Sequence, residues 1–331
     1  MNNQTHDVSS RILQEILNIH RRDREYTSGA TSNEESETIK KIQTPRIQHF
    51  VSAGKPVELV LPAFPAKSPN PGKVLGRLPD MAEKLSLQAL NTLCANIKRI
   101  YSPGAKLTIC SDGRVFSDLI GVDDDDVSNY QASILKIITQ SFPEHLALYN
   151  LEDCNQFNTQ STDFDELRQL MANRYSEPCE AVKRTLLKSE AGVLLYRAIT
   201  RFMFQDSLIP GYVGSKSSLQ KKSKTLAVGV IQRSWAWGAL LADEFPNAIR
   251  LSIHPQPADS LKIGIHMMPT QDDWMTPWHG VAVKVGEKYM LMNRREAELC
   301  GAQLVIQDES ASHYILDTAH MGTAPLPEEV A

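Results

Sequence analysis

Hydrophobic and polar positions follow two alternating periods through the first 150 residues. Short apolar runs predict buried strands, and apolar positions three and four apart predict helices between them. The expected strands cover residues 57–61, 106–110 and 146–151. The expected helices begin at residues 9–10, 44, 80 and 123, with the second stopping at Gly54 and the third near Pro103. This order predicts a Rossmann-like α/β fold, a mostly parallel sheet with flanking helices and with ligands at the carboxyl ends of its strands.

The pattern changes beyond residue 150. A polar segment covers residues 153–162, and Pro178 begins a long helix that continues through Ile199. The sequence SKSSLQKKSK at 215–224 predicts a mobile basic loop, which either closes over an anion or is simply solvated. In the C-terminal third, short alternating runs predict antiparallel strands that continue or flank the first sheet. These strands cover residues 248–253, 261–267, 279–285, 288–292 and 302–306, with one short helix at 294–299.

The chain has no internal repeat and no long polar linker. We therefore expect one α/β domain over residues 51–320, preceded by a helical appendage at 1–50 and followed by a flexible tail at 321–331.

Composition describes an ordinary soluble globule. The 331 residues carry a net charge of −4, and 22% of them are charged. This balance argues against a protein that coats nucleic acid or an anionic membrane. No apolar run approaches the roughly 20 residues that span a bilayer, and the N-terminus has no signal-peptide pattern, so we expect a cytoplasmic protein.

The sequence contains no recognisable cofactor motif. Its five cysteines are scattered without a CxxC pair, which favours reduced thiols. No HxxxH or HxD spacing indicates a metal, and neither GxGxxG nor a P-loop is present. The aspartates at 123–126 are better explained as a helix start, where acidic side chains complement the helix dipole. We expect no metal and no cofactor.

Candidate chemistry gathers first on the loop after the strand at 57–61. This loop is rich in proline and carries Lys67, Lys73 and Arg77. Proline reduces the entropy of a loop, so its cations are held ready for an anion, although a plain surface turn has the same composition. After the next strand, Asp112 and Arg114 flank a glycine, which suits a polyol or phosphate, or else a capped turn with a surface ion pair.

A second group of candidates lies in the C-terminal half. Arg250 and His254 alternate onto one face of an expected strand, and the next strand brings Lys262 beside them. Arg233 is expected at the start of a helix that contains Trp235 and Trp237. His279 follows a Pro-Trp pair and is either a base or a structural histidine.

Five segments in order resemble the pyoverdine/dityrosine-biosynthesis family, whose bacterial members include isocyanide (isonitrile) synthases of secondary metabolism. The segments are PAFPAKSPNPGKVLG at 62–76, CSDGRVFSDL at 110–119, IQRSWAW at 231–237, RLSIHP at 250–255 and TPWHGVAV at 276–283.

The resemblance implies an enzyme that joins the amino group of an aromatic L-amino acid, tyrosine before tryptophan, to C2 of ribulose 5-phosphate. That carbon becomes the isocyanide carbon through imine formation, phosphate elimination and carbon–carbon cleavage, which is lyase chemistry. Such a reaction requires anion clamps and acid/base groups. By position, phosphate and sugar binding are assigned to Lys73, Arg114 and Arg233, and acid/base work to Lys67, His254 and Asp112. Carboxylate or hydroxyl binding is assigned to Arg250, Lys262 and His279.

Two other functions remain open. One is an N-formyl amino acid synthase of the dityrosine type, and the other is a sugar-phosphate binding protein without catalysis. For the isocyanide synthase, the resemblance also implies an iron- and 2-oxoglutarate-dependent oxygenase as a possible pathway neighbour.

Overall fold

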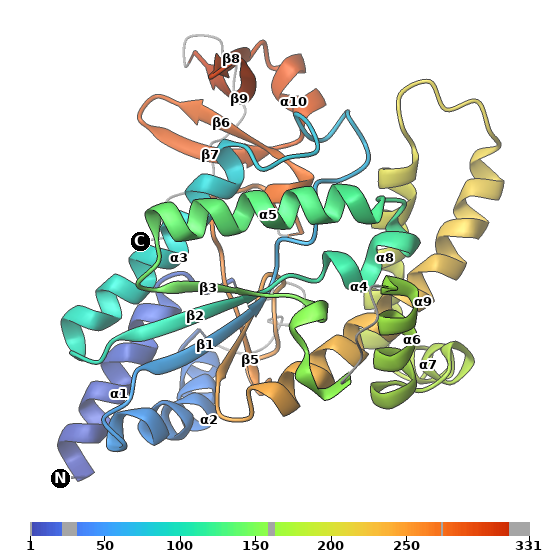
Figure 1. The fold of residues 1–331 in the computed structure, drawn as a ribbon. Helices are drawn as coiled ribbons and strands as arrows, with labels where there is room; N and C mark the ends of the chain where they lie inside the picture. Colours follow the sequence, from blue (N-terminus) through green and yellow to red (C-terminus); the bar gives the residue numbers. More distant parts are fainter. Residues whose placement is uncertain (1, 22–31, 158–162, 273, 318–331) are drawn as a thin grey trace.

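A five-stranded parallel sheet forms the centre of the computed structural model, which describes residues 2–21, 32–157, 163–272 and 274–317 (Figure 1). Its strand order is β3-β2-β1-β4-β5. The strands are β1 (Val57–Pro62), β2 (Ala105–Cys110), β3 (Leu146–Tyr149), β4 (Ile249–Ser252) and β5 (Lys262–Gly264). The predicted Rossmann-like architecture and its first three strands are confirmed. Within the described ranges, no helix is both long and apolar enough to cross a membrane.

Helices cover both faces of this sheet because consecutive strand residues are apolar, so that both faces need to be buried. Leu59 and Leu61 point into the larger core, whereas Val60 points into a second core on the opposite face. The larger core is closed by α1 (Asn2–Leu17), α2 (Ser32–Ser52), α3 (Met81–Ile100) and α5 (Asp124–Ser141). The second core is closed by α4 (Gly113–Ile120), α6 (Phe164–Tyr175) and α9 (Lys216–Glu244).

The start of α3 shows how the sequence specifies a helix boundary. The side chain of Asp80 accepts a hydrogen bond from the backbone N–H of Ala82, and the Glu83 carboxylate accepts one from the backbone N–H of Asp80. This capping box satisfies backbone donors that would otherwise lack partners. The prediction that a helix begins after Asp80 is confirmed.

β4 and β5 differ from the prediction of an antiparallel addition, whereas the later C-terminal strands include the expected antiparallel pairs. β4 pairs with β1 in parallel, and β5 pairs with β4 in parallel, so both extend the first sheet. The connection between β4 and β5 is long enough to return the chain to the amino end of β4, so the two strands form no hairpin. The expected pairing of Arg250 with Lys262 nevertheless holds.

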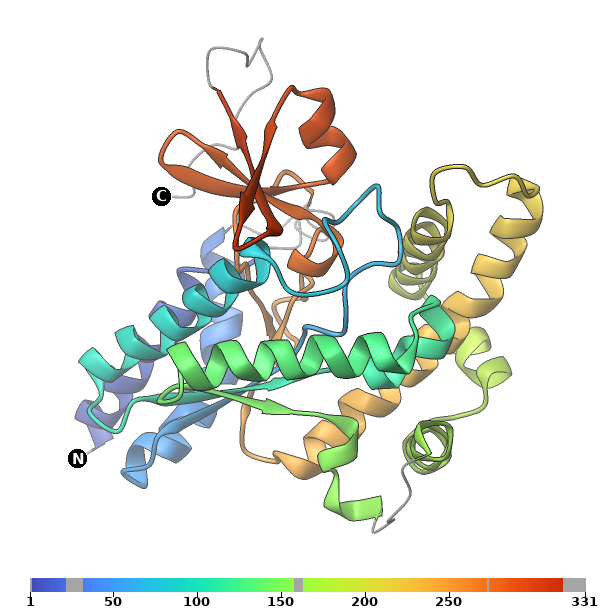
Figure 2. The same ribbon diagram turned by 45° about the horizontal axis from the view of Figure 1, so that its top comes forward.

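The remaining strands form a separate mixed sheet with the order β7-β6-β9-β8, visible beyond the carboxyl ends of the parallel strands (Figures 1 and 2). β6 and β9 are parallel, and the other two pairs are antiparallel. The elements are β6 (Val281–Val285), β7 (Lys288–Met292), α10 (Arg294–Leu299), β8 (Gln303–Gln307) and β9 (Ser310–Leu316).

Four helix predictions are corrected. α1 begins at Asn2, before the expected start at residues 9–10. α2 begins at Ser32, well before the expected start, and contains Pro45 within it. The long helix expected after Pro178 is two helices, α7 (Cys179–Leu186) and α8 (Glu190–Ser207), because Ser189 caps a new helix. The basic stretch expected as a loop is the first part of α9, so Arg233 lies inside that helix rather than at its start.

Parts of two other predictions lie outside the described residues, namely positions 158–162 of the polar segment and the tail at 321–331.

The order of the strands creates a topological switch point between β1 and β4. From β1 the chain moves to β2 and β3 on one side, and it later returns to place β4 and β5 on the other side. Connections therefore leave β1 and β4 in opposite directions, which opens a crevice at their carboxyl ends. The helical hairpin of α8 and α9 stands beside this crevice (Figure 2).

Gly113→Ala is expected to destabilise the fold. A Cβ at Gly113 would lie 1.9 Å from the carbonyl oxygen of Pro65, so the loop after β1 or the start of α4 must shift. Such overpacking costs about 1–3 kcal/mol in the free energy of unfolding, measurable by urea denaturation. Gly76→Ala is the matched control, because its Cβ would meet no atom within 4 Å. Equal stability of the two variants would contradict this close packing.

Candidate active site

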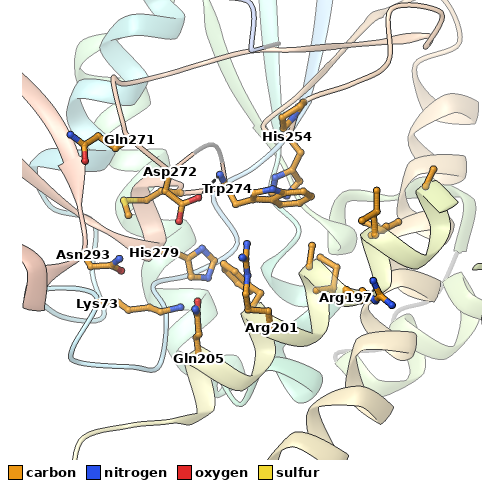
Figure 3. A pocket seen from close by; sticks show the side chains of 18 of the residues that line it. Lys73, Arg197, Arg201, Gln205, His254, Gln271, Asp272, Trp274, His279 and Asn293 are labelled. Carbon is orange, nitrogen blue, oxygen red and sulfur yellow. Dashed lines mark hydrogen bonds between the residues drawn. The ribbon is translucent and has the colours of Figure 1, made fainter. Parts of the chain in front are cut away.

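A cavity of about 810 Å³ lies at the switch point (Figure 3). One wall is α8, and the others are the loop after β1, the segment after β4 and the segment that leads to β6. The polar lining consists of Lys73, Arg197, Arg201, Gln205, His254, Gln271, Asp272, His279 and Asn293. The apolar lining includes Leu194, Leu195, Ile199, Phe202, Pro255, Pro257, Trp274 and Met275. A cavity with both kinds of wall suits a ligand that has an apolar part and charged groups.

Asp206, near the end of α8, joins three parts of this site. Its carboxylate accepts hydrogen bonds from Lys73 Nζ at 2.5 Å and from Ser68 Oγ at 3.0 Å, and His279 Nε2 lies 3.3 Å away. Burial alone would raise the pKa of Asp206, but His279 and Lys73 outweigh burial and hold the pKa at about 2. The carboxylate is therefore charged throughout the neutral range and compensates Lys73.

His279 is held between two partners. Its Nδ1 lies 2.8 Å from the hydroxyl oxygen of Thr276, its Nε2 faces Asp206, and Phe202 packs edge-on at a ring separation of 4.2 Å. Burial lowers the pKa of His279, although Asp206 acts in the opposite direction. The residue sits in the short 3₁₀ helix η3 (Pro277–His279), which fixes its position on the cavity wall.

His254 has a different environment. It follows β4, and its ring lies 4.8 Å from that of Trp274. Its Nδ1 is buried and has no hydrogen-bond partner among the described residues. Burial, with smaller contributions from nearby cations, lowers the pKa of His254 to about 3. His254 is therefore a neutral imidazole on the cavity wall with one nitrogen unused by the protein.

Arg197 and Arg201 extend from α8 on the cavity side, and both side chains are exposed. The sequence interpretation missed both of these residues and Asp206, because helical spacing alone does not separate a cavity wall from a solvent face. Two signals were available. The arginines stand four residues apart with no acidic residue three or four positions from either, and Asp206 follows the apolar residues Phe202, Met203 and Phe204 on the same helix.

The structure brings together three of the residues expected from sequence, namely Lys73, His254 and His279. Lys67 does not line this cavity. Its ammonium lies 2.8 Å from carboxylate oxygens of both Asp80 and Glu83 and donates to the carbonyl of Pro277. Burial alone would lower the pKa of Lys67, but the two carboxylates raise it overall. Lys67 thus stays protonated and ties the loop after β1 to α3.

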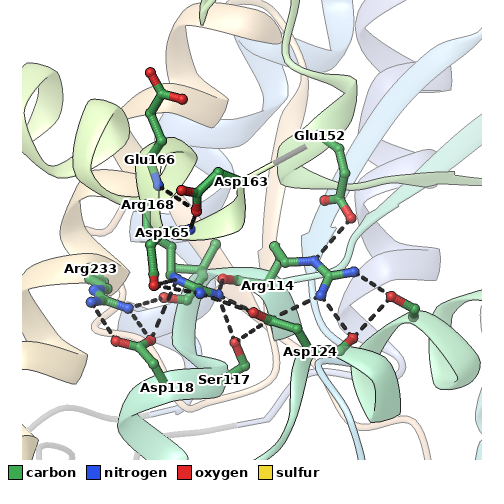
Figure 4. Close-up of polar contacts among 12 residues, drawn as sticks. Arg114, Ser117, Asp118, Asp124, Glu152, Asp163, Asp165, Glu166, Arg168 and Arg233 are labelled. Atoms are coloured by element: carbon green, nitrogen blue, oxygen red, sulfur yellow. Dashed lines mark hydrogen bonds and ion pairs between the residues drawn. The ribbon is translucent and has the colours of Figure 1, made fainter. Parts of the chain in front are cut away.

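Arg114 and Arg233 lie in a separate ion-pair network on α4, α5, α6 and α9 (Figure 4). The guanidinium of Arg114 donates to Glu152, Asp124 and Ser128 and is buried. Arg233 pairs with Asp118 and also donates to the carbonyl of Val115. Both guanidinium groups are bound by protein oxygens outside the cavity. This geometry favours a structural role over the phosphate binding that sequence suggested.

Asp112, Arg250 and Lys262 also lie outside the cavity lining. Asp112 precedes α4, and burial raises its pKa to about 7. Arg250 donates to the carbonyl of Gly238 on α9, and Lys262 lies beside it on β5. The loop after β2 diverges from the switch point, which explains why the charged groups of the SDGR segment do not reach the cavity. In the part of the chain that the structure describes, no group of three or more His, Cys, Asp or Glu side chains is arranged to hold a metal.

Comparisons with known proteins all point to one family of enzymes. The model of the pyoverdine/dityrosine biosynthesis protein family matches residues 47–305. The chain is 55% identical to an L-tyrosine isonitrile synthase of Pseudomonas aeruginosa, over 93% of this chain and 94% of that protein. It is 42% identical to the L-tryptophan isonitrile synthase AmbI2 of Fischerella ambigua, over 86% of this chain and 85% of that protein. The crystal structure of the PvcA protein from Pseudomonas aeruginosa superposes with a TM-score of 0.90 at 55% identity, covering 93% of this chain and 99% of that one.

Asp206→Asn is expected to lower stability in a pH-dependent manner. The folded-state pKa of about 2 lies below the ordinary value of 3.8, so the carboxylate stabilises the fold above about pH 4 and loses this contribution as pH falls through 2. The shift corresponds to about 2 kcal/mol at pH 7 and to roughly half of that at pH 3.

The test is urea unfolding of the protein and the variant at pH 7, 5 and 3. Asp259→Asn, at an exposed site, is the control. An Asp206→Asn effect of the same size at every pH would refute the charged, partnered carboxylate.

Proposed function

Because the chain belongs to the pyoverdine/dityrosine biosynthesis family, in its isocyanide synthase branch, we propose that it is an isonitrile synthase for an aromatic L-amino acid. Tyrosine is the preferred substrate over tryptophan, since the identity to tyrosine isonitrile synthases is 55% and 52%, against 42% for the tryptophan enzymes. Ribulose 5-phosphate supplies the isonitrile carbon from its C2, with loss of phosphate and carbon–carbon cleavage. The reaction is that of a carbon–carbon lyase.

One observation carries this proposal, namely the combination of acid/base groups and apolar walls in a single cavity. Trp274, Pro255 and Pro257 line one side and suit an aromatic ring. Lys73 and His254 line the same cavity and suit proton transfer and sugar binding. The cavity volume of about 810 Å³ is within the range that accommodates small-molecule ligands.

His254 is assigned the role of base. The amino group of the substrate must lose a proton before it attacks the C2 carbonyl, and a neutral imidazole on the cavity wall accepts that proton. A bound anion in the cavity raises the pKa of His254 from about 3 toward the working pH, because a nearby negative charge favours the imidazolium form.

Lys73 and His279 are assigned to the sugar. The Lys73 ammonium has one bond to Asp206 and further donors for hydroxyl or carbonyl oxygens. Asp206 and Thr276 fix the His279 ring, which makes it a positioning and binding residue rather than the first base. A cytoplasmic location and an iron- and 2-oxoglutarate-dependent oxygenase that acts on the isonitrile fit the same proposal.

The decisive experiment uses ribulose 5-phosphate labelled with ¹³C at C2, together with tyrosine or tryptophan. We expect an isonitrile product with its infrared band and with the label in the isonitrile carbon. An N-formyl product would support the dityrosine-type alternative, for which the 31% identity to the spore wall maturation protein DIT1 of Saccharomyces cerevisiae is the relevant observation. Binding of the sugar phosphate without turnover would indicate a binding protein instead of an enzyme.

His254→Gln is expected to reduce kcat by about 10²–10⁴ while changing either KM by less than about threefold. Glutamine retains hydrogen-bonding capacity but cannot accept the proton. Steady-state kinetics with each substrate varied in turn gives both values. His49→Gln, an exposed histidine on α2, should match the unchanged protein. Near-normal kcat for His254→Gln would remove this residue from the proton transfers.

A further inference from the structure

We infer that Arg197 and Arg201 form a subsite for a dianionic phosphate monoester on the cavity side of α8. The identification of that monoester with the sugar phosphate rests on the proposed function. The presence of the subsite itself follows from the charges and geometry of the cavity wall.

Arg201 rises from α8 between His279 and Trp274, and Arg197 stands one helical turn away along the same wall (Figure 3). Neither guanidinium makes a hydrogen bond or ion pair within the described ranges. Other arginines of this chain behave differently. Arg114, Arg168 and Arg233 each donate to carboxylates.

The pair is unfavourable for the helix that carries it. Residues four apart on a helix are neighbours, and like charges there destabilise it. No acidic residue lies three or four positions from either arginine. The repulsion is relieved when a ligand supplies the negative charge, which is the arrangement expected of an anion site.

The other ionisable groups of the cavity do not take the place of the two arginines in binding an anion. Lys73 is already compensated by Asp206, whose carboxylate lies 2.5 Å from its Nζ. The lowered pKa values of His254 and His279 leave both imidazoles neutral near pH 7. Asp272 lines the same cavity, and its carboxylate accepts a hydrogen bond from the backbone N–H of Trp274.

Two guanidinium groups match one phosphate monoester in charge. The planar fork of arginine binds phosphate oxygens in pairs, and two forks neutralise a dianion. A single carboxylate would leave one of the two cations unsatisfied. The subsite therefore selects a phosphate monoester over an amino-acid carboxylate.

The test compares Arg197→Gln and Arg201→Gln with Arg184→Gln, an exposed arginine on α7 outside the cavity lining. Isothermal titration calorimetry measures binding of ribulose 5-phosphate, of inorganic phosphate and of L-tyrosine, each alone. Each cavity variant should weaken both phosphate ligands by about tenfold or more, because hydrogen bonds to charged groups contribute about 1.5–3 kcal/mol. Tyrosine binding should change by less than about twofold, and Arg184→Gln should match the unchanged protein. Circular dichroism confirms that each variant is folded.

The possible outcomes separate the subsite from the proposed function. If the unchanged protein forms isonitrile but the variants bind sugar phosphate normally, the subsite is refuted and the function stands. If the variants lose tyrosine instead, the arginines bind the carboxylate and the inference is wrong. If the unchanged protein binds no phosphate ligand, the inference is also overturned. Arginine-dependent phosphate binding without isonitrile formation would support the subsite and reject the function.

Discussion

The buried carboxylate of Asp206 is the group on which the geometry of the cavity depends. It contacts Lys73 from the loop after β1 and His279 from the turn before β6, and it is itself carried by α8. A buried charge is tolerated only when its partners are in place. The correct position of each of the three segments, α8, the loop after β1 and the turn before β6, therefore depends on the other two. Asp206 thereby fixes the distance between the wall that carries the two exposed arginines and the wall that carries His279.

The strand order explains why this site lies where it does. Connections from β1 and β4 diverge, so a crevice opens between them, whereas β1 and β2 are joined by a crossover on one face and leave no such opening. The charged groups after β2 consequently meet helices instead of solvent. Arg114 is buried there and bound by Asp124 and Glu152, which fastens α4 to α5 and to the end of β3.

Sequence reasoning succeeded where local rules decide the structure. The apolar runs of the first three strands and the cap at Asp80 followed from short-range patterns. Lys73, His254 and His279, which were chosen by position and by the family resemblance, line the cavity, and their roles stay predictions. Sequence reasoning failed where a long-range contact decides. The direction of β4 depends on its pairing with β1, and no local pattern encodes that choice. The roles of Asp206 and of the two arginines of α8 can be recognised only from the cavity that α8 borders in the folded protein.

The electrostatics of the cavity also suggest an order of events under the proposed function. Burial and neighbouring cations hold the pKa of His254 near 3, which makes it a weak base. A dianion bound in the cavity opposes the effect of those cations, and this raises the basicity of the imidazole. The amino group of the second substrate would then be deprotonated most readily after the sugar phosphate has bound. Such an order limits proton transfer to the complex in which the C2 carbonyl is already present to be attacked.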